Sequence, residues 1–369
     1  MVLLIRDNEC FEPRVRNYLE YYKHNGVAYH VVGWNRDGSA KPDANATYYE
    51  KPAQYGKRMG NFGKKVMWML FVMRQIFRHR KNIDAVHACD YDVAIPALLM
   101  CKLLGKTLIF DVFDWLENSS GKFGVYAVID WLENWAYRKA DYVIVCDEER
   151  VKQAKATREQ VFVLPNIPNF KISYDENLMR ELREQRKKYR LVLSYVGVLD
   201  ANRGLENLLE YTATHPDVLL NIAGFGMHEE SVEKYAQQYP NICWRHRVEY
   251  DQGQTIMKES DAIVAMYYLT NPVHKYAAPN KYFESLILGV PLVTTENTAV
   301  GKKVSRFTTG FAIGETINAL EVALGDENLN KKLNEMAENC QSTWDHYYAS
   351  YYDNFMKQNY MKMIGEQIG

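Results

Sequence analysis

The sequence predicts an α/β protein with two doubly wound, Rossmann-like domains in series. Short apolar runs alternate with helical patterns in both halves, which is typical of parallel sheets with crossover helices. The alternation pauses near residue 166, between two prolines, and then restarts. A length of 369 residues also suits two cores better than one. We expect domains at 1–165 and 166–349, with a helix over about 350–369 packing back on the first.

The individual elements follow from the same patterns. Strands in the first half are expected at 2–5, 28–32, 85–88, 107–110, 142–145 and 161–163, with helices at 13–24 and 93–104. The polar stretch 36–55 is interpreted as a long loop. Strands in the second half are expected at 191–195, 219–223, 242–244, 262–265 and 291–294, with helices at 205–211, 229–238, 281–288 and from 328 onward. Ligands bind at the carboxyl ends of such strands, so we expect the two domains to face each other across a central cleft.

Composition excludes several classes of protein. The net charge of -1 gives no overall field that favours nucleic acid. Six scattered cysteines without a CxxC pair predict reduced thiols rather than disulfides or a zinc site. The first residues, MVLLIRDNEC, resemble a strand and not a signal peptide, and no stretch of about 18 apolar residues follows. A cytoplasmic protein is the expectation.

The segment 276–293, YAAPNKYFESLILGVPLV, is the most informative one. Pro279 suits the first turn of a helix, where its missing N–H is harmless. Asn280, Lys281 and Glu284 then place free N–H groups, a cation and a carboxylate along one helix start. That set suits a diphosphate and a ribose diol. The alternative is an ordinary amphipathic helix with solvated charges.

Two further segments each place glycines at the end of an expected strand. In YVGVLDANRGLE, Gly197 lets a ligand approach the backbone, and Arg203 can reach phosphate oxygens from the start of a helix. In NIAGFG, Gly224 and Gly226 form a Gly-x-Gly pair that lacks the third glycine of a dinucleotide fingerprint.

In this order and spacing, the three segments resemble family 4 of the retaining glycosyltransferases. Stretches of the first half resemble the family as well, namely EPRVRNYLEYYKHNGVAYHVV, HACDYDVAIPALL, LIFDVFDWLE, ADYVIVCDEERV and VLPNIPN. The resemblance implies the two-domain GT-B architecture, with the donor sugar nucleotide on the second domain and the acceptor on the first. It implies no cofactor besides a nucleotide-diphosphate sugar, UDP- or GDP-linked, as donor substrate.

The resemblance also implies residue roles on the donor side. Glu284 corresponds to the glutamate that holds the ribose hydroxyls, and Arg203 lies where the family usually has a phosphate-binding lysine. Asn280 and Lys281 match a Pro-Asn-Lys variant of the phosphate site. The backbone near Val248 would contact the base, Gly224 and Gly226 would lie near the sugar, and Gly197 would line the site. We expect Arg203 and Lys281 to be the catalytic cations.

The sequence departs from the family at two positions. Val198 replaces an arginine, and Tyr276 replaces the first glutamate of a paired-Glu motif. Either Lys281 supplies the missing positive charge or the donor site is weakened. The rival functions are therefore a sugar-nucleotide epimerase of the same architecture and a catalytically weakened subunit that binds a partner transferase.

The acceptor side is predicted from polar residues that follow strands of the first half. Asp111 and Asp114 follow the strand at 107–110, and Asp114 is the candidate that orients or deprotonates the acceptor hydroxyl. Its alternative role is an N-cap. His87 and Asp90 end the preceding strand. Asp90-Tyr91-Asp92 spells a metal-binding Asp-x-Asp motif by chance, because Asp92 is expected to cap a helix, and no metal is expected.

A basic run covers residues 57–81, with eight Lys or Arg and no acid, interleaved with aromatic and aliphatic residues. Such a helix can lie on an anionic membrane, or it can be a crossover helix with solvated charges. We interpret it as both. The expected function is transfer of a sugar to the hydroxyl of a glycan or lipid-linked glycan, in surface polysaccharide or glycolipid assembly at the inner face of a membrane.

Overall fold

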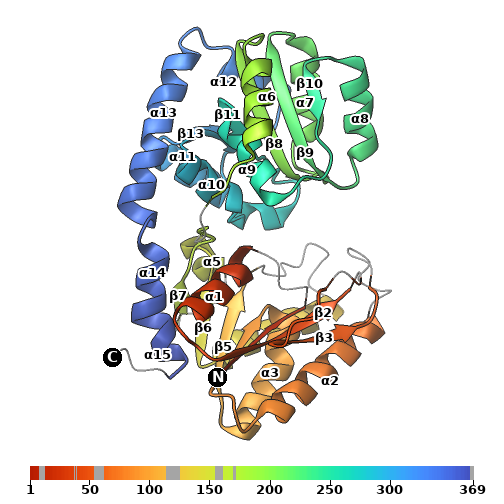
Figure 1. Cartoon of the computed structure of the whole chain (residues 1–369), viewed down its shortest axis with the longest axis vertical. Helices are drawn as coiled ribbons and strands as arrows, with labels where there is room; N and C mark the ends of the chain where they lie inside the picture. The colour runs from red at the N-terminus through yellow and green to blue at the C-terminus, as the bar shows by residue number, and fades with distance from the viewer. Residues whose placement is uncertain are drawn as a thin grey trace. The chain divides into compact units, whose positions relative to one another are not determined.

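The computed structural model describes residues 1–7, 13–36, 38, 40–53, 62–113, 125–153, 161–168 and 172–365. The chain forms two compact units (Figure 1). Unit 1 comprises Met1–Pro168 and Tyr351–Gly369, and unit 2 comprises Asn169–Ser350. The end of the chain therefore belongs to the same unit as its beginning.

Unit 1 contains a seven-stranded sheet in the described residues, in the order β3-β2-β1-β4-β5-β6-β7. Its strands are β1 (Val2–Arg6), β2 (Tyr29–Asn35), β3 (Ala46–Glu50), β4 (Ala85–Cys89), β5 (Thr107–Val112), β6 (Tyr142–Val145) and β7 (Val161–Val163), all parallel. The order reverses between β1 and β4, which is the topological switch point of a doubly wound sheet.

Helices cover both faces of this sheet. One face packs against α2 (Phe62–His79), α3 (Tyr91–Leu104) and α4 (Val125–Lys139), around a core that includes the buried rings of Trp34 and Trp68. The other face packs against α1 (Pro13–His24) and the end of the chain, and α5 (Glu148–Gln153) follows β6.

The last residues are an integral part of the core of unit 1. They form α14 (Tyr351–Phe355), a π-helical turn (Met356–Tyr360) and α15 (Met361–Met363). Tyr352, Met356 and Tyr360 are buried among side chains of β1 and α1. The Tyr351 hydroxyl donates to the Val163 carbonyl at 2.9 Å, so this segment is also bonded to β7.

Unit 2 repeats the same topology with a six-stranded parallel sheet among its described residues, ordered β10-β9-β8-β11-β12-β13. Its strands are β8 (Leu191–Val198), β9 (Val218–Phe225), β10 (Ile242–Trp244), β11 (Ala262–Val264), β12 (Leu292–Thr295) and β13 (Gly310–Ile313). Its helices are α6 (Glu176–Arg186), α7 (Leu205–Thr214), α8 (Glu229–Gln238), α9 (Tyr250–Lys258), η2 (Pro272–Tyr276), α10 (Asn280–Leu288), α11 (Ala299–Phe307), α12 (Ile317–Leu324), α13 (Leu329–Thr343) and the π-helical turn Trp344–Tyr348.

The predicted fold class, two parallel Rossmann-like units, is confirmed, but two edge strands were missed. The stretch interpreted as a loop contains β3, ATYYE, which pairs with β2. Its side chains are all at least partly exposed, so it lacks the apolar run that signals a buried strand. Likewise β13, GFAI, is only half-buried at its centre. In the parts of the chain that the structure describes, no helix is long and apolar enough to cross a bilayer.

Candidate functional site

In unit 2, a buried carboxylate lies one turn into α10. Glu284 is 3% exposed and accepts hydrogen bonds from Gln254 (3.0 Å) and from the Tyr250 hydroxyl (3.2 Å). Its other oxygen pairs with the Lys281 ammonium at 2.5 Å. A buried carboxylate needs such partners. Lys281 and Glu284 are three residues apart on α10, a spacing that allows this ion pair.

The start of α10 is otherwise polar and accessible. Asn280 is its first residue and is half-buried. Pro279 is the N-cap, with ψ of 145°, one position before the first turn where the sequence placed it. The N-cap is a proline, whose side chain makes no capping hydrogen bond. The Tyr282 N–H bonds the Pro279 carbonyl at 3.3 Å, and the N–H groups before it can serve as donors for an anion.

The glycines that end β8 and β9 have different roles. Gly224 lies opposite Gly197 in the register, with φ of 149°, and a Cβ on it would lie 1.8 Å from the Gly197 oxygen. A Cβ on Gly226 would lie 2.4 Å from the Leu199 oxygen. These two glycines therefore serve close packing of the strand ends. A Cβ on Gly197 would meet nothing within 4 Å, so its α-carbon faces open space that a ligand could enter.

Arg203 lies just before the N-cap of α7 and is stacked on an aromatic ring. Its guanidinium carbon is 4.6 Å from the centroid of Tyr267. Burial raises the pKa of Tyr267 to about 12, with the charge of Glu284 adding to the rise and that of Arg203 opposing it. His274 packs edge-on against the same ring at 5.7 Å. Arg203 and Glu284 thus act on one buried tyrosine.

The two departures from the family motif are also placed by the structure. Val198 ends β8 with half of its surface exposed. Tyr276 is the last residue of η2 and is half-buried, with Lys275 near its ring. Val248 lies just before α9. Its side chain packs with Ala223, near the end of β9, and with Ile256 of α9.

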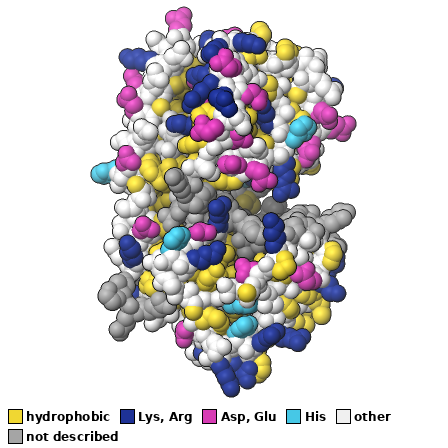
Figure 2. Space-filling model, in the orientation of Figure 1, with side chains coloured by type: hydrophobic (Ala, Val, Ile, Leu, Met, Phe, Trp, Pro, Cys, Tyr) yellow, Lys and Arg dark blue, Asp and Glu magenta, His cyan; other side chains and the backbone are white. Residues whose placement is uncertain are grey.

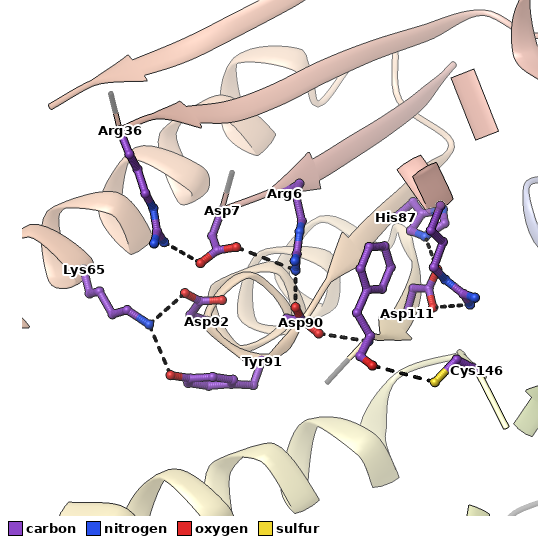
Figure 3. Close-up of polar contacts among 12 residues, drawn as sticks. Arg6, Asp7, Arg36, Lys65, His87, Asp90, Tyr91, Asp92, Asp111 and Cys146 are labelled. Carbon is purple, nitrogen blue, oxygen red and sulfur yellow. Dashed lines mark hydrogen bonds and ion pairs between the residues drawn. The ribbon is translucent and has the colours of Figure 1, made fainter. Parts of the chain in front are cut away.

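In unit 1, charged residues gather at the carboxyl ends of β1, β2 and β4 (Figure 3). Arg6 forms ion pairs with Asp90 and with Asp7, the latter at 3.6 Å, and Arg36 contacts Asp7 at 2.5 Å. Asp90 has φ of 67° and ψ of 169°, a region that is nearly exclusive to glycine and costs about 1–3 kcal/mol. Its carboxylate also accepts the Phe113 N–H at 2.9 Å, which helps to hold this strained backbone.

Asp92 differs from its predicted capping role. The helix α3 begins at Tyr91, so Asp92 lies inside the first turn and is 2% exposed. Its carboxylate is 3.2 Å from the Lys65 ammonium. Burial and the charge of Asp7, to which it is hydrogen-bonded, raise the pKa of Asp92 to about 7, and burial likewise opposes ionisation of Asp7, whose pKa is nevertheless lowered by Arg6 and Arg36. The two carboxyls therefore share about one proton at mildly acidic pH and lose it as pH rises through about 7.

His87 and Asp111 lie beneath this edge and not on it. Both are fully buried and joined at 3.3 Å. Asp111 also receives two hydrogen bonds from Arg14 (2.8 and 3.1 Å) and one from Tyr18 (2.8 Å). Burial favours the neutral acid, but Arg14 and His87 outweigh it and lower the pKa of Asp111 to about 2. The Asp111 side chain, which was expected to face the acceptor, is thus covered by α1.

The same network also holds the segment that leads from unit 1 to unit 2 and the segment that returns from unit 2 to unit 1. The Arg14 guanidinium donates to the Leu164 carbonyl at 2.6 Å and to Asn166 at 3.0 Å. From the chain end, the Tyr360 hydroxyl bonds His87 at 2.6 Å. Asp111 is therefore the centre of a buried structural network. Asp114, the predicted base, lies outside the described residues.

Comparison with known proteins supports these two units. The model for glycosyltransferase family 4 matches residues 12–167, and the model for glycosyl transferases group 1 matches residues 177–343. The chain belongs to the glycosyltransferases. No curated protein matches it by sequence.

Solved structures share the fold of this glycosyltransferase at low identity. Sucrose-phosphate synthase from Thermosynechococcus elongatus is 15% identical, with a TM-score of 0.72 over 98% of each chain. HepE from Anabaena in complex with UDP is 15% identical, with a TM-score of 0.67 over 92% of this chain and 93% of that one. WaaG, a glycosyltransferase involved in lipopolysaccharide biosynthesis, is 15% identical, with a TM-score of 0.65 over 96% and 98%. The fold is therefore GT-B.

Sequence reasoning missed several polar residues of the glycosyltransferase. Arg6, Asp7 and Arg36 each follow or end a strand, and that position is the signal that could have found them. Lys65 was treated only as part of a basic run. In the described ranges, no group of three or more His, Cys, Asp or Glu side chains is arranged to hold a metal ion.

Proposed function

We propose that this glycosyltransferase moves a sugar from a nucleotide-diphosphate sugar to an acceptor hydroxyl, with retention and without a metal. The observation that carries the proposal is the grouping of Lys281, Glu284 and an uncapped helix start on α10. The resemblance to family 4 supports retention. A UDP-linked donor is favoured because the structurally similar HepE was solved with UDP and with UDP-glucose.

The partners of Glu284 suggest how the site would accept a donor. Lys281 neutralises the carboxylate. An incoming diphosphate would compete for Lys281, and Glu284 would still keep Tyr250 and Gln254 as donors. A buried carboxylate would thus not be left unpaired when the lysine turns to phosphate. The freed oxygen of Glu284 would accept the ribose hydroxyls.

Arg203 would supply the second cation. The leaving diphosphate gains negative charge as the sugar bond breaks, so cations there stabilise the transition state more than the ground state. The stacking on Tyr267 fixes the guanidinium plane without neutralising its charge. Val198 cannot take this role, which leaves Arg203 and Lys281 as the proposed clamp.

On the acceptor side, Asp114 remains our candidate for orienting the acceptor hydroxyl. Among the residues that the structure describes, Asp90 is the alternative candidate. Because His87 and Asp111 are covered by α1, we assign them a supporting role. We propose a glycan or lipid-linked glycan as acceptor and surface polysaccharide or glycolipid assembly as the setting. The basic helix α2 would contact an anionic membrane.

Calorimetry with UDP and GDP tests the donor site. Glu284→Gln should weaken nucleotide binding by about 1.5–3 kcal/mol because a charged acceptor to the ribose is lost. Arg203→Ala and Lys281→Ala should each lower turnover by roughly 100-fold or more. Lys331→Ala, at an exposed lysine of α13, is the control and should change neither. Unchanged affinity in the Glu284 variant would refute the assignment.

The rival functions give different results in the same assays. An epimerase would convert the sugar nucleotide without releasing the nucleoside diphosphate, whereas a transferase releases it when acceptor is added. A weakened subunit would bind the donor poorly and release no nucleoside diphosphate with or without acceptor. Val198→Arg should partly rescue Lys281→Ala if both cations serve the same phosphate oxygens.

A further inference from the structure

Exposed apolar side chains in unit 1 are concentrated on three neighbouring helices. Among the described residues of unit 1, every large apolar side chain that is exposed to solvent lies on α2, α3 or α4. They are Val66, Met67, Leu70, Phe77, Leu99, Leu103, Val128 and Trp131. Since α2 packs on α3, and α3 on α4, these side chains share the outer surface of one helix layer.

The helix α2 is apolar on two opposite sides. Trp68, Val72 and Ile76 are buried against the sheet. Met67 and Leu70 are more than half exposed, and helical geometry places them almost opposite the buried stripe. The outer side of a surface helix is normally polar, so this stripe is not explained by the core of unit 1.

The outer stripe continues over α3 and α4. The helix α3 is buried along most of its length, and its exposed positions include Leu99 and Leu103, the latter 75% exposed. On α4, Trp131 is 62% exposed and stacks on Trp135 at 6.5 Å. Tryptophan favours the boundary between water and lipid because its ring is apolar and its N–H is polar.

The exposed charges on this layer are predominantly basic. The exposed charged residues of the three helices, in the described part, are Lys64, Arg74, Arg78, Lys102, Arg138 and Lys139. Two acids lie at this surface: Asp130 of α4, which is partly exposed, and Asp141, which follows α4 and lies 3.3 Å from Lys102. Figure 2 shows basic and hydrophobic side chains side by side over the part of unit 1 where α2 and α3 lie.

We propose that the outer surface of α2, α3 and α4 together lies flat on an anionic lipid membrane. The inference rests on the membrane contact proposed above for α2 and extends it to a three-helix face. Apolar side chains would enter the interface while cations meet the lipid headgroups. The helix layer then separates sheet and membrane by about one helix diameter, about 10–12 Å. The charged edge of unit 1 would stand beside the headgroups of lipid-linked acceptors.

A membrane fits this face better than a second copy of the chain. A symmetric dimer brings the same patch against itself, so the cations of the two copies would face each other. Like charges brought together at an interface are unfavourable. Anionic lipid supplies the opposite charge and needs no shape complementarity.

Vesicle sedimentation tests the extent of the face. The probes are vesicles of phosphatidylcholine alone and of phosphatidylcholine mixed with phosphatidylglycerol. Replacing Leu103 and Trp131 by serine should weaken binding to the anionic vesicles by roughly tenfold or more, as should replacing Met67 and Leu70. Val322→Ser, at an equally exposed site on α12 of unit 2, should bind as the parent does.

Each alternative result overturns the proposal. Loss of binding only in the α2 variant would confine the contact to that helix, and absence of binding in the parent would exclude the membrane. Self-association without lipid that the substitutions abolish would make the face a dimer interface. Leu103→Ser alone serves if the Trp131 substitution prevents folding. UDP affinity, measured in parallel, should be unchanged throughout, which separates this result from failure of the donor site.

Discussion

The carboxyl pair at the edge of unit 1 should make the protein less stable as pH rises through neutrality. Burial and the charge of Asp7 raise the pKa of Asp92 from 3.8 to about 7. Each pKa unit corresponds to about 1.4 kcal/mol, so the shift of about three units is worth about 4 kcal/mol in the free energy of unfolding. Asp92 is 2% exposed, so solvent screens this effect little.

The sign follows from which state holds the proton. Between the two pKa values the folded chain keeps a proton on Asp92 that the unfolded chain has lost. The stabilisation is fully present below about pH 4 and is lost as pH rises through about 7. About 3 of the 4 kcal/mol fall between about pH 5 and about pH 8.

Urea unfolding at these two pH values measures the effect. Asp92→Asn keeps the shape of the side chain and cannot ionise. Between these two pH values the free energy of unfolding of the variant should therefore drop by about 3 kcal/mol less than that of the parent. Asp7→Asn should also flatten the profile because it removes the neighbouring charge. Asp353→Asn, at an exposed aspartate of unit 1, is the control. Parallel pH profiles for the parent and Asp92→Asn would refute the reasoning.

Three further substitutions test the other assignments. Tyr360→Phe removes hydrogen bonds to Tyr22 and His87 and should lower the free energy of urea unfolding by about 1–3 kcal/mol, with UDP affinity unchanged. Gly224→Ala would force a Cβ against a backbone carbonyl and should lower the thermal unfolding temperature by several degrees. Gly197→Ala should leave that temperature almost unchanged and weaken UDP binding, because its methyl group would point into open space at the proposed donor site. Equal effects of the two glycine substitutions on unfolding would contradict the distinction between them.

Sequence patterns predicted those parts of the fold that are determined by residues close together in the sequence. Buried parallel strands are continuous apolar runs, so β1, β4 and β5 could be recognised directly. An edge strand pairs with only one neighbouring strand and buries less of its side-chain surface, so β3 has no comparable apolar run. The sequence indicated that Lys281 and Glu284 lie along one helix start, but it assigned them to phosphate and ribose and did not predict the ion pair between them.

Contacts between distant segments could not be predicted in this way. Nothing near Asp111 in the sequence indicates that Arg14 and Tyr18 cover it, because those residues come from the helix after β1. The same holds for the hydrogen bond from Tyr360 to His87. A polar residue at the end of a strand can therefore belong to a ligand site or to a buried network, and only its long-range partners decide which.

The discontinuous core of unit 1 has a consequence for how the protein is made. Domains usually fold in order as they leave the ribosome. Here the aromatic side chains that complete one face of the first sheet are supplied by Tyr351–Gly369, which is synthesised after unit 2. That face stays uncovered while the whole of unit 2 is being translated. The nascent chain should therefore need chaperones until Tyr351–Gly369 has been made, and a variant that lacks this segment should aggregate rather than yield a shortened enzyme.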